Sequence, residues 1–155
     1  MKIYILRHEE RYEPPTFYTT LTPCGHKNAD NLKHILSSLN ISKIFSSPFL
    51  RTIQTIIPYC LQNNLKSQIC VEYSLYETMY DKCFTKENYK VRLTAHDKEF
   101  KYTDPEYSSL IDINDINCPE TKSNVKLRIT NFINNLISSY KQSDECILIV
   151  AHGAV

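Results

Sequence analysis

The alternation of strand-like and helix-like segments constrains the fold of this chain more than any other feature. Four short runs rich in β-branched residues are typical of buried strands; they span residues 2–6, 41–45, 68–72 and 146–150. Amphipathic helical patterns fall between them. Strands that alternate with helices predict an α/β fold whose mostly parallel sheet is joined by right-handed crossovers.

Two of the predicted helices share one start signal, a hydroxyl residue followed by proline. Thr22-Pro23 opens the first, because threonine caps the first turn and proline fits the first helical position. Ser46-Ser47-Pro48 repeats this signal before a second apolar stripe, and we expect Pro58 to bend or end that helix near Ile57. The strongest helical periodicity covers residues 120–140.

Residues 74–119 are the least regular part of the sequence, rich in Tyr and Lys and weak in periodicity. We interpret this stretch as an insertion or lid. Its lysines would suit an acidic substrate, although such a run is more often a solvated face. No internal repeat or linker divides the chain, so we expect residues 1–155 to form a single domain.

Glycine is scarce, because Gly25 and Gly153 are the only two in the chain. Average usage would give roughly eleven, so neither a Gly-rich phosphate loop nor a G-x-S-x-G nucleophile elbow can be written. The formal net charge of +1 gives no electrostatic reason to expect nucleic acid or an acidic membrane as a partner. The oligomeric state is left open.

Cysteine usage and apolar runs bear on the compartment. The six cysteines include no C-x-x-C pair, which favours reduced thiols over a disulfide framework in a chain of this length. The apolar start, residues 1–6, is too short for the core of a signal peptide, and no run approaches transmembrane length. We therefore expect a cytoplasmic protein.

Arginine and histidine side chains gather at three of the predicted strand ends. Arg7 and His8 follow the first strand. Ser46-Ser47 leads into Arg51 after the second, and His152 follows the last. Ligands of open α/β sheets bind outside the carboxyl ends of the strands, so we expect these residues to converge. Because arginine is rare here, at five against thirteen lysines, and grips phosphate oxygens bidentately, the cluster predicts a phosphate site.

Five segments carry the clearest motifs of the sequence. In chain order they read Leu6-Arg7-His8, Leu21-Thr22-Pro23-Cys24-Gly25, Ser46-Ser47-Pro48-Phe49-Leu50-Arg51-Thr52-Ile53-Gln54-Thr55, Leu75-Tyr76-Glu77 and Ala151-His152-Gly153. They resemble the L-R-H-G, L-T-x-x-G, S-S-P-x-x-R-x-x-Q-T, L-x-E and terminal H-G motifs of the histidine phosphatase (phosphoglycerate mutase-like) superfamily. The resemblance spans nearly the whole chain. It implies a three-layer α/β sandwich, with a mostly parallel central sheet flanked by helices.

The resemblance also implies a reaction, the hydrolysis of a phosphomonoester through a phosphohistidine on His8. The substrate would be a small molecule or a phosphoprotein. Arg7, Arg51 and His152 would bind the transferred phosphate, and neighbouring guanidinium groups would keep the attacking histidine unprotonated. Glu10 and Arg11 place the chain nearest the members that read R-H-G-E-R, which implies that Arg11 also contacts phosphate.

Glu77 is the implied general acid that protonates the leaving oxygen. Three other acidic residues near it are alternatives: Glu72, Asp81 and Glu87. The resemblance implies neither a cofactor nor a metal. The zinc motif H-E-x-x-H begins at His8-Glu9, but tyrosine stands at position 12.

Two departures from the family pattern leave other functions open. Glu9 stands where the family has glycine, which puts a second carboxylate beside the expected phosphate site. The chain also ends at Val155, so the family's final helix and strand are expected to be missing. We therefore weigh two alternatives to the phosphatase: a phosphoglycerate mutase-type phosphoryl transfer, and a catalytically impaired module that binds a phosphorylated ligand or protein.

Overall fold

A computed structural model describes residues 1–65, 68–79, 84 and 92–153 of the chain. Its strands are β1 (Lys2–Arg7), β2 (Lys43–Ser46), β3 (Ile69–Val71) and β4 (Cys146–Ala151), and its helices are α1 (Pro23–Ser37), α2 (Leu50–Gln62) and α3 (Lys122–Tyr140). Three short 3-10 turns follow β3: η1 (Tyr73–Leu75), η2 (Phe100–Tyr102) and η3 (Ile113–Asp115). The four runs predicted as strands all form strands, with ends shifted by up to two residues.

The strands described here form one sheet in the order β1-β4-β2-β3, and every pairing is parallel. The parallel sheet expected from the alternating pattern is therefore confirmed. The register pairs Arg7 of β1 with Ala151 of β4, and Ser46 of β2 with Val150 of β4. The carboxyl ends of these three strands consequently lie side by side.

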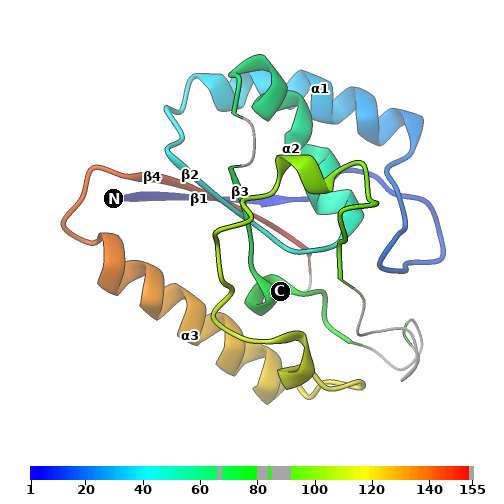
Figure 1. Cartoon of the computed structure of the whole chain (residues 1–155), viewed down its shortest axis with the longest axis vertical. Helices are drawn as coiled ribbons and strands as arrows, with labels where there is room; N and C mark the ends of the chain where they lie inside the picture. The colour runs from blue at the N-terminus through cyan, green and yellow to red at the C-terminus, as the bar shows by residue number, and fades with distance from the viewer. Residues whose placement is uncertain (66–67, 80–83, 85–91, 154–155) are drawn as a thin grey trace.

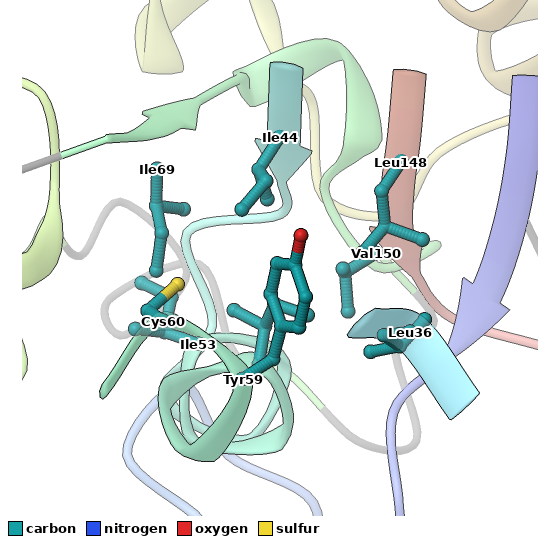
Figure 2. Packing of buried hydrophobic residues seen from close by; sticks show 9 residues of the cluster. Leu36, Ile44, Ile53, Tyr59, Cys60, Ile69, Leu148 and Val150 are labelled. Atoms are coloured by element: carbon teal, nitrogen blue, oxygen red, sulfur yellow. The ribbon is translucent and has the colours of Figure 1, made fainter. Parts of the chain in front are cut away.

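The sheet lies between helices on both faces, with α1 and α2 on one side and α3 on the other (Figure 1). One buried cluster joins α1 and α2 to the sheet and includes Leu36, Ile53, Tyr59 and Leu148 (Figure 2). A second cluster joins α3 to the opposite face through residues such as Phe132 and Ile149. Successive strand residues point to opposite faces, so both faces of β4 are covered and all of its residues are buried.

Helix α2 departs from the prediction in two ways. It continues through Pro58 to Gln62, so the expected end near Ile57 is wrong. Its buried side chains, including Ile56, Tyr59 and Cys60, lie on both sides of the proline; this packing outweighs the lost backbone hydrogen bond. The helix also begins at Leu50 without a side-chain cap, so the expected serine cap followed by proline is wrong as well.

The first helix follows the prediction closely. Thr22 caps α1, its hydroxyl accepting a hydrogen bond from the backbone N–H of Gly25, and Pro23 occupies the first helical position. No disulfide joins any two of the five cysteines that the structure describes, and Cys83 lies outside the described residues. Among the helices of the described chain, none combines the length and the apolar character that crossing a bilayer requires.

Candidate active site

The two histidines that follow β1 and β4 lie beside each other. His8 comes directly after Arg7 and His152 directly after Ala151, the last pair in the register between these strands. The backbone N–H of His8 extends the ladder by donating to the Ala151 carbonyl at 3.0 Å. The two rings meet edge to face with centroids 5.3 Å apart, and both side chains are buried. The sheet itself therefore sets the spacing of the pair.

His8 is held as a neutral ring with one nitrogen free. Its Nδ1 lies 2.7 Å from the backbone carbonyl of Glu9, which can only accept, so Nδ1 carries the proton and Nε2 keeps its lone pair. Burial lowers the pKa of His8 to about 4, and the nearby His152 and Arg51 act in the same direction. At neutral pH, Nε2 is therefore available as a nucleophile.

The loop after His8 is fixed by contacts with both α1 and α2. The backbone N–H of Glu9 donates to the hydroxyl of Thr55 at 3.0 Å, and the N–H of Thr22 donates to the Glu10 carbonyl at 3.0 Å. Gly25 permits this close approach, because a Cβ atom there would lie 2.1 Å from the Glu10 carbonyl oxygen. Glycine at this position is thus a steric requirement of the loop that follows His8.

Arg51 is a fully buried cation on α2, with no exposed surface. It donates to the Thr16 carbonyl at 2.8 Å and to Glu77 Oε2 at 3.3 Å, and its guanidinium carbon lies 4.4 Å from the centre of the Phe49 ring. Within the described part of the chain its Nε has no hydrogen-bond partner. Burial lowers the pKa of Arg51 to about 10, so the side chain stays charged at neutral pH.

His152 connects the end of β4 with two other residues of the cluster. Its Nε2 lies 2.8 Å from the hydroxyl of Ser47, and its Nδ1 lies 3.1 Å from Glu77 Oε2 without being aligned for a hydrogen bond. Burial lowers the pKa of His152 to about 4, so this ring is also neutral at neutral pH. Ser47, which the sequence suggested as a helix cap, is instead a partner of this histidine.

Glu77 completes the cluster from the segment that follows η1. Burial opposes its ionisation, but the contact with His152 and the positive charge of Arg51 outweigh it and lower the pKa of Glu77 to about 2. Its Oε1 also accepts from the backbone N–H of Thr78 at 3.2 Å. Without a bound anion, Glu77 is therefore a carboxylate and not an acid.

The other two predicted phosphate ligands lie at the edge of this cluster. Arg7 is exposed and its side chain lies over Gly153, where a Cβ atom would come within 3.1 Å of the arginine Nε. Arg11 forms an ion pair with Glu13 at 2.8 Å and donates to the Tyr12 carbonyl at 3.0 Å. The structure thus brings together His8, Arg51, Glu77 and His152, while the phosphate-binding roles of Arg7 and Arg11 stay predictions.

The alternatives to Glu77 differ from it in their surroundings. Glu72 is fully buried and accepts hydrogen bonds from Tyr107, Ser109 and the backbone N–H of Ser74 and Leu110. Its carboxylate is therefore occupied in holding the loop that contains residues 107–110. Asp81 and Glu87 lie outside the described residues. Three histidines without motifs, His26, His34 and His96, are exposed.

Several residues support the cluster in roles that the sequence did not suggest. Thr55 holds the loop after His8, and Ser47 contacts His152. A buried ion pair, Glu120 with Arg128, binds the backbone on both sides of Glu77. Ser47 and Thr55 stand inside the S-S-P-x-x-R-x-x-Q-T motif, which is a signal that could have found them. No local pattern marks Glu120 and Arg128.

The cluster has the donor atoms of a cation site but the charge of an anion site. Nitrogen and oxygen atoms of His8, Glu77 and His152 all lie within 4.8 Å of one another, which is close enough for three ligands of one metal ion. Arg51, however, lies 3.3 Å from the same carboxylate and would repel a cation. A buried guanidinium with a free donor beside two neutral imidazoles favours an oxyanion.

Comparison with known proteins supports this interpretation. The model of the family described as "Histidine phosphatase superfamily (branch 1)" matches residues 4–155. No curated protein matches the chain.

Similar solved structures include three phosphatases. The ecdysone phosphate phosphatase of Bombyx mori, in complex with tungstate, has a TM-score of 0.67 and 16% identity over 97% of this chain and 72% of its own. A mycobacterial glucosyl-3-phosphoglycerate phosphatase, in complex with inorganic phosphate, has a TM-score of 0.62 and 18% identity over 97% of this chain and 72% of its own. The alpha-ribazole phosphatase of Shigella flexneri has a TM-score of 0.63 and 21% identity over 98% of this chain and 74% of its own. At these identities the likeness shows the fold, and the predicted three-layer, phosphoglycerate mutase-like architecture is confirmed.

Proposed function

This chain belongs to the histidine phosphatase superfamily, branch 1, and from that premise we propose that it hydrolyses a phosphomonoester through a phosphohistidine formed on His8. The substrate is a small phosphorylated molecule or a phosphoprotein. Two of the similar solved structures hold tungstate or inorganic phosphate, which supports an oxyanion site in the shared fold.

One observation carries the proposal: a fully buried arginine stands beside two neutral histidines. Arg51 keeps a positive charge, and its Nε has no hydrogen-bond partner among the residues that the structure describes, while His8 offers an unprotonated Nε2. A phosphoryl group needs a nucleophile in line with the leaving oxygen and positive charge on its equatorial oxygens. The cluster places a candidate nucleophile, His8, beside His152 and the buried positive charge of Arg51. Arg7 and Arg11 would add charge at its rim.

The first chemical step breaks the ester. Nε2 of His8 attacks phosphorus and forms a P–N bond while the P–O bond to the leaving group breaks. Arg51 and His152 stabilise the charge on the phosphoryl oxygens during this transfer. The leaving oxygen takes a proton from Glu77, so the products of this step are an alcohol and phosphohistidine.

Glu77 must gain that proton when substrate binds, because its pKa of about 2 keeps it ionised in the free protein. A substrate monoanion brings the proton with it. The phosphate charge placed beside Glu77 raises the pKa of the carboxyl and draws Arg51 away from it, so the proton passes from the phosphoryl group to Glu77. Glu77 therefore becomes an acid only in the complex.

The second step regenerates the histidine. Glu77, now a carboxylate again, takes a proton from water as the water oxygen attacks phosphorus and the P–N bond breaks. His8 returns to its neutral form, and inorganic phosphate leaves with the proton that Glu77 held. These steps use only side chains of this chain.

Turnover of p-nitrophenyl phosphate by the wild type and by His8→Ala tests the proposal. We expect the variant to lose at least about 10⁴-fold in kcat, as is common when a nucleophile is removed, and we expect the wild type alone to form an acid-labile phosphoprotein. His26→Ala is the matched control, since His26 is an exposed histidine outside the cluster. Activity that survives His8→Ala would exclude the mechanism. An inactive wild type that still binds phosphate would indicate the binding module instead.

A further inference from the structure

The segment that carries Glu77 is held on both sides by one buried ion pair. Glu120 precedes α3, and Arg128 lies on the second turn of that helix. We propose that Glu120 and Arg128 form a clamp that positions Glu77 for proton transfer, so that Arg128 is a positioning residue for the general acid. This inference rests on the proposed function and adds a residue pair that acts through Glu77.

The clamp is a continuous chain of hydrogen bonds around the acid. Arg128 donates to the Ser74 carbonyl at 2.6 Å, three residues before Glu77. It also grips Glu120 with two parallel bonds, Nε to Oε1 at 2.8 Å and one terminal nitrogen to Oε2 at 2.9 Å. The Glu120 Oε2 then accepts from the backbone N–H of Met79 at 3.1 Å, two residues after Glu77. A backbone bond from Glu120 to the Met79 carbonyl, at 2.9 Å, doubles this last link.

The position of the clamp explains why it affects the acid. Helix α3 covers one face of the sheet, whereas Arg51, which contacts the Glu77 carboxyl, belongs to α2 on the other face (Figure 1). Glu77 stands in the short segment after η1. From there its carboxyl contacts Arg51 of α2, although its segment is bound to α3. The clamp fixes the backbone on either side of Glu77 against α3, and the carboxyl then lies 3.3 Å from Arg51 and 3.1 Å from His152.

The burial of the pair indicates a geometric role. The Glu120 side chain is 2% exposed and that of Arg128 7%. Buried ion pairs often add little to stability compared with apolar residues of similar size. The bidentate geometry of arginine, however, fixes direction as well as distance. Among the described residues, the Arg128 side chain donates hydrogen bonds only to Glu120 and to the Ser74 carbonyl near Glu77.

A clamp of this kind has a distinctive kinetic consequence. Proton donation matters most for a leaving group that is a strong base and little for one that leaves readily as an anion. A displaced Glu77 therefore slows the hydrolysis of phenyl phosphate more than that of p-nitrophenyl phosphate. Damage to phosphate binding, by contrast, slows both esters alike, because both present the same phosphoryl group.

The test compares kcat/KM for the two esters in Arg128→Lys. This variant keeps the positive charge beside Glu120 but loses the two parallel hydrogen bonds of the guanidinium. We expect at least a tenfold loss for phenyl phosphate and less than a threefold loss for p-nitrophenyl phosphate, the same pattern as Glu77→Gln. In a Glu77→Gln background, Arg128→Lys should cause no further change in the ratio of the two values. If the single variant folds poorly, the double variant Arg128→Met, Glu120→Gln takes its place. It removes both charges together, so no unpaired charge is left buried.

Two controls separate positioning from general destabilisation. Leu36→Ala removes a buried side chain from α1, in a different cluster, and should leave the ratio for the two esters unchanged. Thermal stabilisation by inorganic phosphate should persist in both clamp variants, because Arg51 and the histidines are intact. An unchanged ratio in the clamp variants, or a further change on top of Glu77→Gln, would overturn the clamp alone. A wild type that hydrolyses neither ester would overturn the proposed function and the clamp with it.

Discussion

The residues expected to hold phosphate and the residue expected to deliver the proton are positioned in different ways. His8, Arg51 and His152 stand on or directly after β1, α2 and β4, and the pairing of the strands sets their spacing. Glu77 stands in a short segment after η1, held by hydrogen bonds to Glu120 and Arg128. We refer to these two regions as the phosphate end and the acid segment.

The two regions differ in what holds their side chains in position. The phosphate end stands on, or directly after, the strands and helices that bury the main hydrophobic clusters, so close packing supports its backbone. The acid segment depends on a few buried polar contacts, each of which can be removed singly. Substitutions at the phosphate end should therefore affect all substrates equally, whereas those in the acid segment should depend on the leaving group.

Among variants that keep the histidine expected to act as nucleophile, the largest effect should come from Arg51→Ala at the phosphate end. The variant loses the buried charge that stabilises the transferred phosphoryl group, and we expect kcat to fall by about 10²- to 10³-fold with both phenyl and p-nitrophenyl phosphate. Arg92→Ala is the control, since Arg92 is an exposed arginine paired with Asp112. A loss of less than threefold would remove Arg51 from the site.

The two regions should also titrate in separate pH windows. His152 has a pKa of about 4 when folded and about 6.5 when unfolded, so the unfolded state binds more protons between these values. The contribution of His152 to the free energy of unfolding is fully present above pH 6.5. It falls by on the order of 3 kcal/mol as the pH drops to 4. His8 acts in the same direction, because burial lowers its pKa as well.

Glu77 should act in the lower window. Its folded pKa of about 2 lies below its ordinary value of 4.5, so its contribution is present above 4.5 and is lost toward pH 2. Urea unfolding between pH 7 and 2 measures both windows. His152→Asn should reduce the pH dependence of stability in the upper window, where that of His8 is still present, and Glu77→Gln should reduce it in the lower window. A variant that changes only the opposite window would contradict the assignment.

Glu77→Gln should show the substrate dependence of the acid segment. The amide keeps the size of the side chain but cannot donate the proton, so we expect kcat/KM for phenyl phosphate to fall by about 10- to 100-fold and that for p-nitrophenyl phosphate to change less. Glu106→Gln, an exposed glutamate outside the cluster, is the control. Equal losses for both esters would mean that Glu77 serves the phosphate end instead.

The smallest effect should come from Ser47→Ala. The change removes the hydroxyl 2.8 Å from His152 Nε2 and leaves a buried nitrogen unpaired, which costs about 1–2 kcal/mol. We expect a loss of about tenfold for both esters, the pattern of the phosphate end. Ser46→Ala is a matched control, because Ser46 is equally buried and its hydroxyl donates to the Ser47 carbonyl instead of contacting a histidine. Equal activity in the two variants would show that Ser47 does not support His152.

The sequence predicted the regular parts of the molecule well and the irregular parts poorly. The strands and the capped start of α1 follow from apolar patterns and from Thr22-Pro23. The same cap signal at Ser46-Ser47-Pro48 was misleading, because Ser47 turns to a histidine 105 residues away. Pro58 did not end α2, since burial on either side of it outweighs the local penalty.

The candidate site divides along the same line. The sequence by itself determined the α/β alternation and the placement of His8, Arg51 and His152 after strands, because these depend on local patterns and on the rule that parallel strands end together. Only the tertiary structure decided the tautomer of His8, the contact between Ser47 and His152, and the clamp around Glu77. Those contacts depend on which buried polar groups meet after packing. Ser74 and Arg128, for example, are 54 positions apart, and no pattern in the sequence predicts their contact.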